Sequence, residues 1–180
     1  MSVLEVVEKF VSINGEGTKA GQLAVFIRFK GCNLNCKYCD TKWANEADAT
    51  AQQMTKEDIL EYVLSTGVKN VTLTGGEPLL RDGIEDVIEC LADNNLNVEI
   101  ETNGSITLDN IRKLHKDNVT FTMDYKLSCS GMEQAMRLEN FSVLNKNDTV
   151  KFVAGCHEDL VRTKQIIEKY NLYGKCNLYI

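Results

Sequence analysis

Three cysteines stand close together in one short segment of the chain. Three residues separate Cys32 from Cys36 and two separate Cys36 from Cys39, so the three thiolates can turn toward one centre. Soft sulfur ligands select iron-sulfur clusters, zinc or copper(I) over hard cations. Structural zinc takes four protein ligands, and no second Cys/His pair at short spacing follows. Three thiolates on a four-iron cluster leave one iron open to a small chelating ligand, so the spacing favours a catalytic cluster.

The same spacing would also place three small apolar side chains on the buried face of a helix. The residues between the cysteines argue against that alternative. Gly31, Asn33 and Asn35 are poor helix formers that favour turns. Lys37 and Asp40 do not extend an apolar stripe. We therefore expect a ligand-bearing loop.

Strands alternate with helices along the rest of the chain. We expect an extended lead-in over 6–13 and six strands, over 23–29, 71–74, 98–102, 119–126 and 150–154 and from 177 onward. Helices are expected over 55–66, 84–91, 108–114, 132–138 and 158–170. The first helix begins with a capping box at Thr55 and Asp58 and ends at Gly67. This alternation indicates βαβ units with parallel pairing.

The predicted strands alternate in polarity, although parallel strands buried on both faces are almost continuously apolar. Glu99 and Glu101, for example, oppose Val98 and Ile100. An antiparallel sheet with one solvated face is the alternative, but the intervening helices count against it. The prediction is an α/β fold, a partial (β/α)6 barrel with mostly parallel strands, forming one domain over 1–180. Its chemistry is expected in a polar lumen, at the carboxyl ends of the strands.

Three charged residues are predicted to face that lumen. Asp124 and Lys126 have the same parity on one strand and so point the same way, although a surface ion pair has the same pattern. Arg28 lies on the strand that leads into the cysteine segment. A guanidinium there would bind a carboxylate bidentately.

Composition excludes several classes of protein. The chain has 180 residues, 43% of them hydrophobic and 26% charged, which is typical of a globular domain. Its net charge of −6 disfavours a nucleic-acid partner. We see no membrane span or signal peptide, and seven cysteines with three clustered fit a reducing compartment, so the expected location is cytoplasmic. Cys90, Cys156 and Cys176 are expected to be buried small hydrophobic residues, whereas Cys129 lies beside a predicted binding loop.

Two motifs resemble those of the radical S-adenosylmethionine (SAM) superfamily. They are the CxxxCxxC spacing of Cys32, Cys36 and Cys39 and the glycine-rich run Gly75-Gly76-Glu77. Within that superfamily, segments 12–17, 26–28, 31–34, 39–41 and 124–126 are similar to the 7-carboxy-7-deazaguanine synthase family. The resemblance implies a carbon-nitrogen lyase of queuosine and 7-deazapurine biosynthesis. Such an enzyme converts 6-carboxy-5,6,7,8-tetrahydropterin to 7-carboxy-7-deazaguanine with loss of ammonia.

The resemblance also implies cofactors, partners and site residues. The cofactors are a [4Fe-4S] cluster, S-adenosyl-L-methionine and Mg²⁺, and the partners are an electron donor such as flavodoxin or ferredoxin and a second copy in a homodimer. The cluster ligands would be Cys32, Cys36 and Cys39, and Thr41 would ligate Mg²⁺. The SAM contacts would be Tyr38, Gly75, Gly76, Glu77, Asn103, Asp124, Lys126 and Ser128. The substrate contacts would be Ile13, Asn14, Gly15, Glu16, Arg28 and Thr74.

The chain departs from the family pattern at three places. Asn14 replaces a glutamine, and Leu127-Ser128-Cys129-Ser130 stands where the family has a proline followed by serines. The chain also stops at Ile180 within an apolar strand, so we expect either a truncated chain or a site completed by a dimer partner. Two other functions stay open: a radical-SAM activase that installs a glycyl radical on a partner enzyme, and a zinc-binding module using His115 or His157 as a further ligand.

Overall fold

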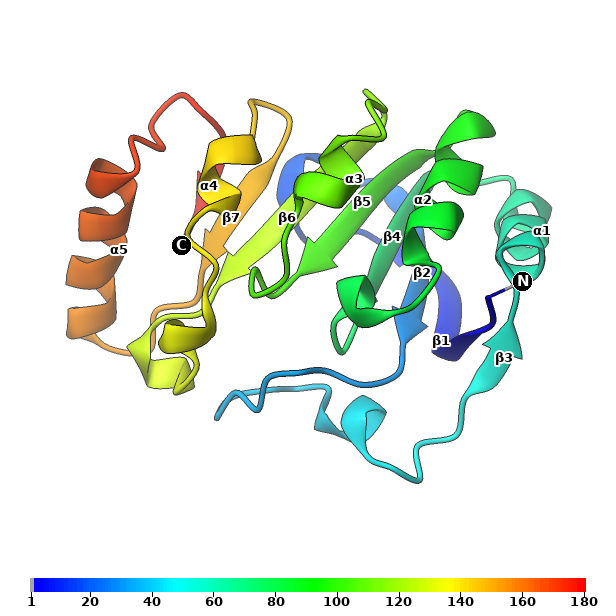
Figure 1. The fold of residues 1–180 in the computed structure, drawn as a ribbon, viewed down its shortest axis with the longest axis horizontal. Coiled ribbons are helices and arrows are strands. Elements are labelled where there is room, and N and C mark those ends of the chain that lie inside the picture. The colour runs from blue at the N-terminus through cyan, green and yellow to red at the C-terminus, as the bar shows by residue number, and fades with distance from the viewer. Residues whose placement is uncertain (1) are drawn as a thin grey trace.

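The computed structural model describes residues 2–180, which form one open, eight-stranded sheet covered by helices (Figure 1). The strands are β1 (Leu4–Ile13), β2 (Leu23–Phe29), β3 (Gln52–Met54), β4 (Asn70–Gly75), β5 (Asn97–Thr102), β6 (Val119–Tyr125), β7 (Thr149–Phe152) and β8 (Asn177–Tyr179). The helices are α1 (Lys56–Thr66), α2 (Ile84–Asp93), α3 (Asp109–Arg112), α4 (Asn140–Val143) and α5 (His157–Lys169). None of these helices is long and apolar enough to cross a membrane.

The strand order is β3-β1-β2-β4-β5-β6-β7-β8. The six strands from β2 to β8 in this order pair in parallel, which confirms the predicted mostly parallel α/β fold. β1 pairs antiparallel with β2 and with β3 and so extends the sheet at one edge. The arrowheads of β2, β5, β6 and β7 point to the same edge, where the segment between β2 and β3 crosses (Figure 1). The carboxyl ends of the strands and the cysteine segment therefore meet.

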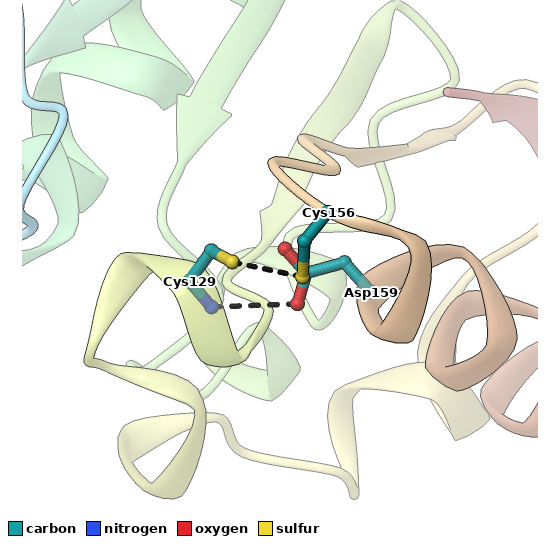
Figure 2. Close-up of side chains that lie close together, drawn as sticks. All are labelled: Cys129, Cys156 and Asp159. Carbon is teal, nitrogen blue, oxygen red and sulfur yellow. Dashed lines mark hydrogen bonds between the residues drawn. The ribbon is translucent and has the colours of Figure 1, made fainter.

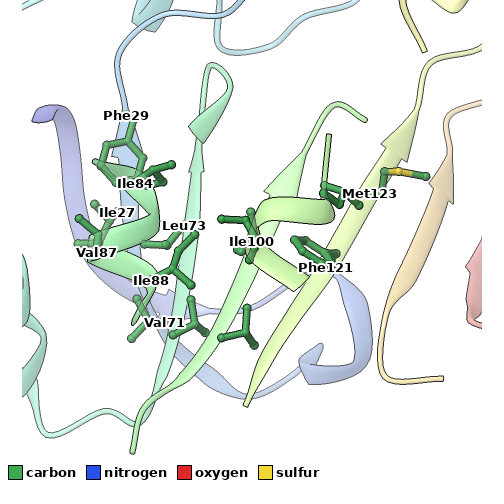
Figure 3. Packing of buried hydrophobic residues seen from close by; sticks show 14 of the residues in the cluster. Ile27, Phe29, Val71, Leu73, Ile84, Val87, Ile88, Ile100, Phe121 and Met123 are labelled. Atoms are coloured by element: carbon green, nitrogen blue, oxygen red, sulfur yellow. The ribbon is translucent and has the colours of Figure 1, made fainter. Parts of the chain in front are cut away.

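Apolar side chains between the sheet and the helices form the core. Ile84, Val87 and Ile88 of α2 pack over Leu73 and Ile100 of the central strands (Figure 3). All five side chains are buried. Because one face of the sheet is sealed by this packing, the polar side chains on the opposite face are left to line a ligand site.

The expected capping box is confirmed at the start of α1. Thr55 Oγ1 accepts a hydrogen bond from Asp58 N (3.1 Å), and Asp58 Oδ2 accepts one from Thr55 N (2.8 Å). Gly67 ends the helix with a φ of 71°, a conformation that glycine adopts without a β-carbon penalty.

The prediction of a helix over 132–138 is wrong. Only a 3-10 turn, η5 (Glu133–Ala135), forms there. After this turn the chain bonds outside the segment, because Arg137 N donates to Gly104 O (3.1 Å). The Met136 sulfur accepts from Lys126 N (3.2 Å). Contacts to the ends of β5 and β6 thus replace helical hydrogen bonds.

Candidate active site

A cavity of about 450 Å³ lies at the carboxyl ends of the parallel strands. It contains all three cysteines of the CxxxCxxC motif together with charged groups from β2, β6 and β7. The predicted site residues that line it are Glu16, Arg28, Cys32, Cys36, Tyr38, Cys39, Thr41, Thr74, Gly75, Gly76, Asn103, Asp124 and Lys126. The sheet topology thus brings together residues that are far apart in the sequence.

The cysteine segment forms a loop, as expected, and is held at several backbone positions. Gly31 N donates to Ala44 O (3.1 Å), and Lys37 N donates to Ser130 O (3.0 Å). Cys32 Sγ accepts from Leu34 N (3.4 Å) and lies 3.5 Å from Asn103 Nδ2. The core-helix alternative is therefore excluded, since residues 31–39 contain turns and no helix.

Burial raises the pKa of the Cys32 thiol, and the nearby Glu77 carboxylate raises it further. Burial also raises the pKa of Cys36, although the Lys126 ammonium opposes that shift. An iron-sulfur cluster held by these cysteines would stabilise their thiolate forms and so oppose these shifts in pKa. No histidine lines the cavity among residues 2–180, so neither His115 nor His157 supplies the further ligand that the zinc alternative needs.

The glycine-rich turn is built directly against the cysteine loop. Glu77 N donates to Gly31 O (2.9 Å), and a β-carbon on Gly76 would lie 1.8 Å from that same oxygen. The Glu77 side chain is fully buried and does not line the cavity. Its carboxylate accepts hydrogen bonds from Leu79 N (3.1 Å), Thr102 Oγ1 (2.9 Å) and Asn103 N (2.7 Å). It thereby ties the turn to the end of β5.

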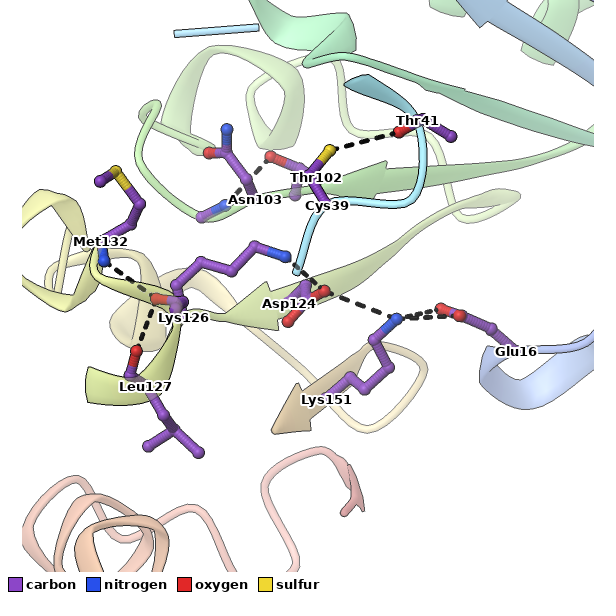
Figure 4. Close-up of polar contacts among 12 residues, drawn as sticks. Glu16, Cys39, Thr41, Thr102, Asn103, Asp124, Lys126, Leu127, Met132 and Lys151 are labelled. Carbon is purple, nitrogen blue, oxygen red and sulfur yellow. Dashed lines mark hydrogen bonds and ion pairs between the residues drawn. The ribbon is translucent and has the colours of Figure 1, made fainter. Parts of the chain in front are cut away.

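A chain of ion pairs crosses the cavity (Figure 4). Lys126 Nζ lies 2.6 Å from Asp124 Oδ2, and Lys151 Nζ lies 3.5 Å from the same oxygen. Lys151 Nζ also contacts both carboxylate oxygens of Glu16, at 2.8 Å. Asp124 and Lys126 are only 17% and 13% exposed, so the pair belongs to the cavity wall and not to the outer surface.

Arg28 reaches the cavity from β2, as its position predicts. Its Nε donates to Glu8 Oε2 (3.0 Å), and its Nη1 donates to the Gly75 carbonyl oxygen (3.0 Å). These two contacts fix the plane of the guanidinium and connect it to the glycine turn. The remaining donors are available to an anion in the cavity.

Tyr38 and Thr41 flank the third cysteine. Lys126 Nζ lies 5.9 Å from the centre of the Tyr38 ring, and burial raises the pKa of this phenol to about 12. Thr41 Oγ1 lies 3.7 Å from Cys39 Sγ, with both atoms beside the cavity (Figure 4). A hydroxyl oxygen therefore lies beside the third cysteine of the motif.

Four further predicted residues do not line the cavity. Ile13 is 65% exposed, and Gly15 borders a neighbouring pocket. The buried Asn14 side chain hydrogen-bonds Glu99, and its Oδ1 accepts from Glu16 N (3.0 Å). Ser128 Oγ donates to Asp159 Oδ1 (2.8 Å). Asn14 thus shapes the loop that presents Glu16.

The structure adds Glu101, Lys151 and Asn45 to the wall. Burial raises the pKa of Glu101 to about 7, and the neighbouring carboxylates of Glu16 and Glu99 act in the same direction. The parity of Glu101 on its strand was the available signal, but it did not distinguish this residue from other polar residues of the sheet. For Lys151 the alternation of side chains gave no comparable signal, because its strand is short.

The lining residues fit a cluster and a polar cofactor. Three thiols supply the soft ligands that an iron-sulfur cluster takes. Asp124 Oδ1 and Asn45 Oδ1 are buried without a hydrogen-bond partner, and both residues line the cavity. Buried acceptors are normally satisfied, so a ligand carrying N–H or O–H donors is expected to meet them. The amino group and ribose of SAM carry such donors.

Residues 26–125 match the family model of the radical SAM superfamily. The chain belongs to this superfamily, whose members use a [4Fe-4S] cluster and SAM. It is 59% identical, over 98% of its length and 80% of the relative's, to a 7-carboxy-7-deazaguanine synthase of Clostridium acetobutylicum. A synthase of the same name from Methanospirillum hungatei is 34% identical over 92% of this chain and 68% of the relative. Within the superfamily, the chain is therefore a member of the 7-carboxy-7-deazaguanine synthase family.

Solved structures agree with this assignment. The crystal structure of QueE from Escherichia coli matches 92% of this chain and 78% of its own, with a TM-score of 0.71 and 25% identity. Streptococcus suis SuiB bound to S-adenosylmethionine matches 81% of this chain and 40% of its own, with a TM-score of 0.60 and 13% identity. The second likeness concerns the fold alone.

Proposed function

We propose that the chain converts 6-carboxy-5,6,7,8-tetrahydropterin to 7-carboxy-7-deazaguanine with loss of ammonia. The observation that carries this proposal is one cavity that holds the three cysteines, the glycine turn and a fixed guanidinium. The cysteines and the glycine turn serve radical SAM chemistry in general. Arg28 adds a partner for a substrate carboxylate, which an activase acting on a protein backbone would not need.

Cys32, Cys36 and Cys39 would hold the cluster, and the Gly75-Gly76 turn would present backbone groups to the SAM amino group. When bound, the cluster and SAM supply the radical chemistry that removes a hydrogen atom from the substrate. Lys126 would bind the SAM carboxylate, and the unpartnered Asp124 Oδ1 would accept a cofactor donor. Tyr38 would pack against the adenine, and Asn103, beside Cys32, would contact the cofactor.

Arg28 would bind the carboxylate of the pterin, and Thr41 would ligate the Mg²⁺ that orients it. Glu16 and Thr74 would contact the pterin ring, together with Glu101. At a pKa of about 7, the Glu101 carboxyl can hold a proton in one step and release it in another. Asn14 would act by fixing the Glu16 loop, and Ile13 and Gly15 would contribute backbone groups.

The proposal includes the cellular setting. We expect residues 1–180 to act as one radical-SAM domain in the cytoplasm, within a homodimer. Flavodoxin or ferredoxin would supply the electron. The substrate is a small molecule, so neither a nucleic acid nor a membrane is needed.

The test is an anaerobic assay of reconstituted protein with SAM, Mg²⁺, a reductant and the carboxylated pterin. Deazapurine and 5′-deoxyadenosine are followed by mass spectrometry. Deazapurine formation, abolished in Cys36→Ala but retained in Cys90→Ser, is the expected result. Cleavage of SAM without deazapurine would overturn the substrate assignment and would favour the activase.

A further inference from the structure

Two cysteines outside the CxxxCxxC motif lie in contact (Figure 2). Cys129 belongs to the 3-10 turn η4 (Ser128–Ser130) after β6, and Cys156 directly precedes α5. Their Sγ atoms are 3.1 Å apart, and both residues are partly exposed. Cys156 was expected to be an isolated, buried residue, so its pairing with Cys129 corrects that expectation.

A buried carboxylate holds the two loops together. Asp159 Oδ1 accepts hydrogen bonds from Ser128 Oγ (2.8 Å) and Cys129 N (3.3 Å), and its Oδ2 accepts one from Gly155 N (3.0 Å). Burial alone would raise the pKa of Asp159, but these hydrogen bonds lower it to about 2. Asp159 therefore stays charged and links the loop after β6 to the loop after β7.

Gly155 permits this close approach. A β-carbon at that position would lie 3.1 Å from Cys129 Cβ and 3.4 Å from Cys129 Sγ. The first distance is shorter than ordinary van der Waals contact. A side chain at residue 155 would thus require Cys129 to shift by a few tenths of an ångström.

We propose that Cys129 and Cys156 form a reversible disulfide by exchange with a small-molecule disulfide. The hydrogen bonds to Cys156 and Asp159 raise the pKa of Cys129 to about 12, so Cys156 supplies the attacking thiolate. It attacks a sulfur of the small disulfide and releases a first small thiol, leaving a mixed disulfide. The second cysteine sulfur displaces the other small thiol and completes the bridge. The two cysteines lose two electrons and two protons, and the small disulfide is reduced to two thiols. Because disulfide sulfurs lie about 2.05 Å apart, the two Sγ atoms need to move about 1 Å closer.

A metal ion is the competing occupant, because the ligand atoms of Cys129, Cys156 and Asp159 all lie within 4.8 Å of one another. Two features favour the disulfide. Both Asp159 oxygens already accept hydrogen bonds from the loops they position. The site also adjoins the first turn of α5, where the helix dipole disfavours a cation.

The bridge would join two loops at the active-site edge of the sheet. The loop that carries Cys129 also contacts the cluster loop, because Ser130 O accepts from Lys37 N (3.0 Å). Lys37 lies between Cys36 and Cys39. Closing the bridge would thus restrain a segment that packs against the ligands of the cluster. The inference does not depend on the identity of the substrate.

The test uses anaerobically purified, cluster-loaded protein equilibrated with mixtures of oxidised and reduced glutathione. Free thiols are then alkylated, and peptides are analysed by mass spectrometry. We expect a linked Cys129–Cys156 peptide that dithiothreitol reverses. Cys129→Ser should yield only a glutathione adduct at Cys156, and Cys90→Ser should retain the bridge. Gly155→Ala, which crowds Cys129, should reduce the bridged fraction at a given glutathione ratio.

Two results would overturn the proposal. One is independent alkylation of Cys129 and Cys156, with no linked peptide at any ratio while the cluster spectrum is intact. The other is one equivalent of Zn²⁺, added to the same protein, that blocks alkylation of both residues and stays bound through native mass spectrometry. That result, lost in Cys156→Ser, would identify a metal site instead.

Discussion

The carbonyl oxygen of Gly31 lies where a side chain on Gly76 would have to be. A β-carbon on Gly76 would come within 1.8 Å of that oxygen and 2.2 Å of its carbonyl carbon. The same oxygen accepts the Glu77 N–H at 2.9 Å. The glycine turn is thus a support for the cluster loop as well as a candidate cofactor contact. The CxxxCxxC loop and the glycine-rich turn therefore form one structural unit.

Gly76→Ala is therefore expected to displace the cluster loop. Backbone atoms cannot give way as a flexible side chain can, so we expect a cost of about 1–3 kcal/mol in unfolding free energy. Because the displaced segment carries Cys32, the iron and sulfide bound per chain after reconstitution should fall severalfold. Metal analysis and urea unfolding measure the two effects.

Gly174→Ala provides the matched control. Gly174 has a φ of 72°, and the space that a β-carbon would occupy there is open, so alanine brings strain without a clash. It should cost about 1–2 kcal/mol and leave the iron content unchanged. Equal iron loss in both variants would show that general destabilisation, and not the Gly31 contact, empties the cluster site.

Local patterns predicted the elements that carry the site. The parity of Asp124 and Lys126 placed both on the cavity wall, because side chains alternate along a strand whatever its neighbours. The capping box and Gly67 fixed α1 for the same local reason. Arg28 followed from its place on a strand that ends at the cysteine loop.

Features that depend on distant contacts could not be predicted. Glu77 belongs to the glycine-rich motif, for which a cofactor contact was predicted, yet its carboxylate is used by backbone donors from η3 (Pro78–Leu80) and the end of β5. β3 is a three-residue strand at the edge of the sheet, and it pairs with β1, about fifty residues earlier in the sequence. Cys129 and Cys156 meet because β6 and β7 are neighbours, which no sequence spacing expresses.

Arg28→Lys is expected to weaken substrate binding specifically. Lysine keeps the charge but loses the planar fork that holds Glu8 and Gly75 and binds a carboxylate through two parallel N–H donors. The KM for the carboxylated pterin should rise about 10- to 100-fold, equivalent to roughly 1.4–2.8 kcal/mol, while SAM affinity stays within about twofold. Steady-state kinetics and equilibrium SAM binding check this. Arg137→Lys, an exposed arginine, is the control, and an equal loss of SAM affinity in Arg28→Lys would contradict the assignment.

Thr41→Ala is expected to weaken the response to Mg²⁺. Removing the proposed hydroxyl ligand beside Cys39 should raise the Mg²⁺ concentration for half-maximal turnover about 10- to 100-fold, the range found when metal-site partners are lost. Thr41→Ser keeps the oxygen and should behave as the wild type. Chelation of Mg²⁺ should reduce deazapurine formation in both the wild type and Thr41→Ser. If Thr41→Ala and Thr41→Ser respond alike, the hydroxyl is not a ligand.

Glu101→Gln should stabilise the cofactor-free protein in a pH-dependent way. Burial raises the pKa of Glu101 from 4.5 to about 7, so the folded chain retains a proton that the unfolded chain releases. The stability that the protonated group contributes is full below about pH 4.5 and is lost as the pH rises through about 7. At pH 8 the glutamine variant should therefore be more stable than the wild type by up to roughly 3 kcal/mol. At pH 4.5 the difference should be small.

Urea unfolding at several pH values measures this effect, with Glu61→Gln on the exposed side of α1 as the control for lost charge. The control should change the unfolding free energy by less than about 0.5 kcal/mol at every pH. In the same Glu101→Gln protein, deazapurine formation should fall by about 100-fold or more, because amide nitrogen cannot exchange a proton as a carboxyl does. A gain in stability together with a loss of turnover separates a role in the reaction from a role in folding. A variant that is both less stable at pH 8 and less active would instead place Glu101 in the scaffold.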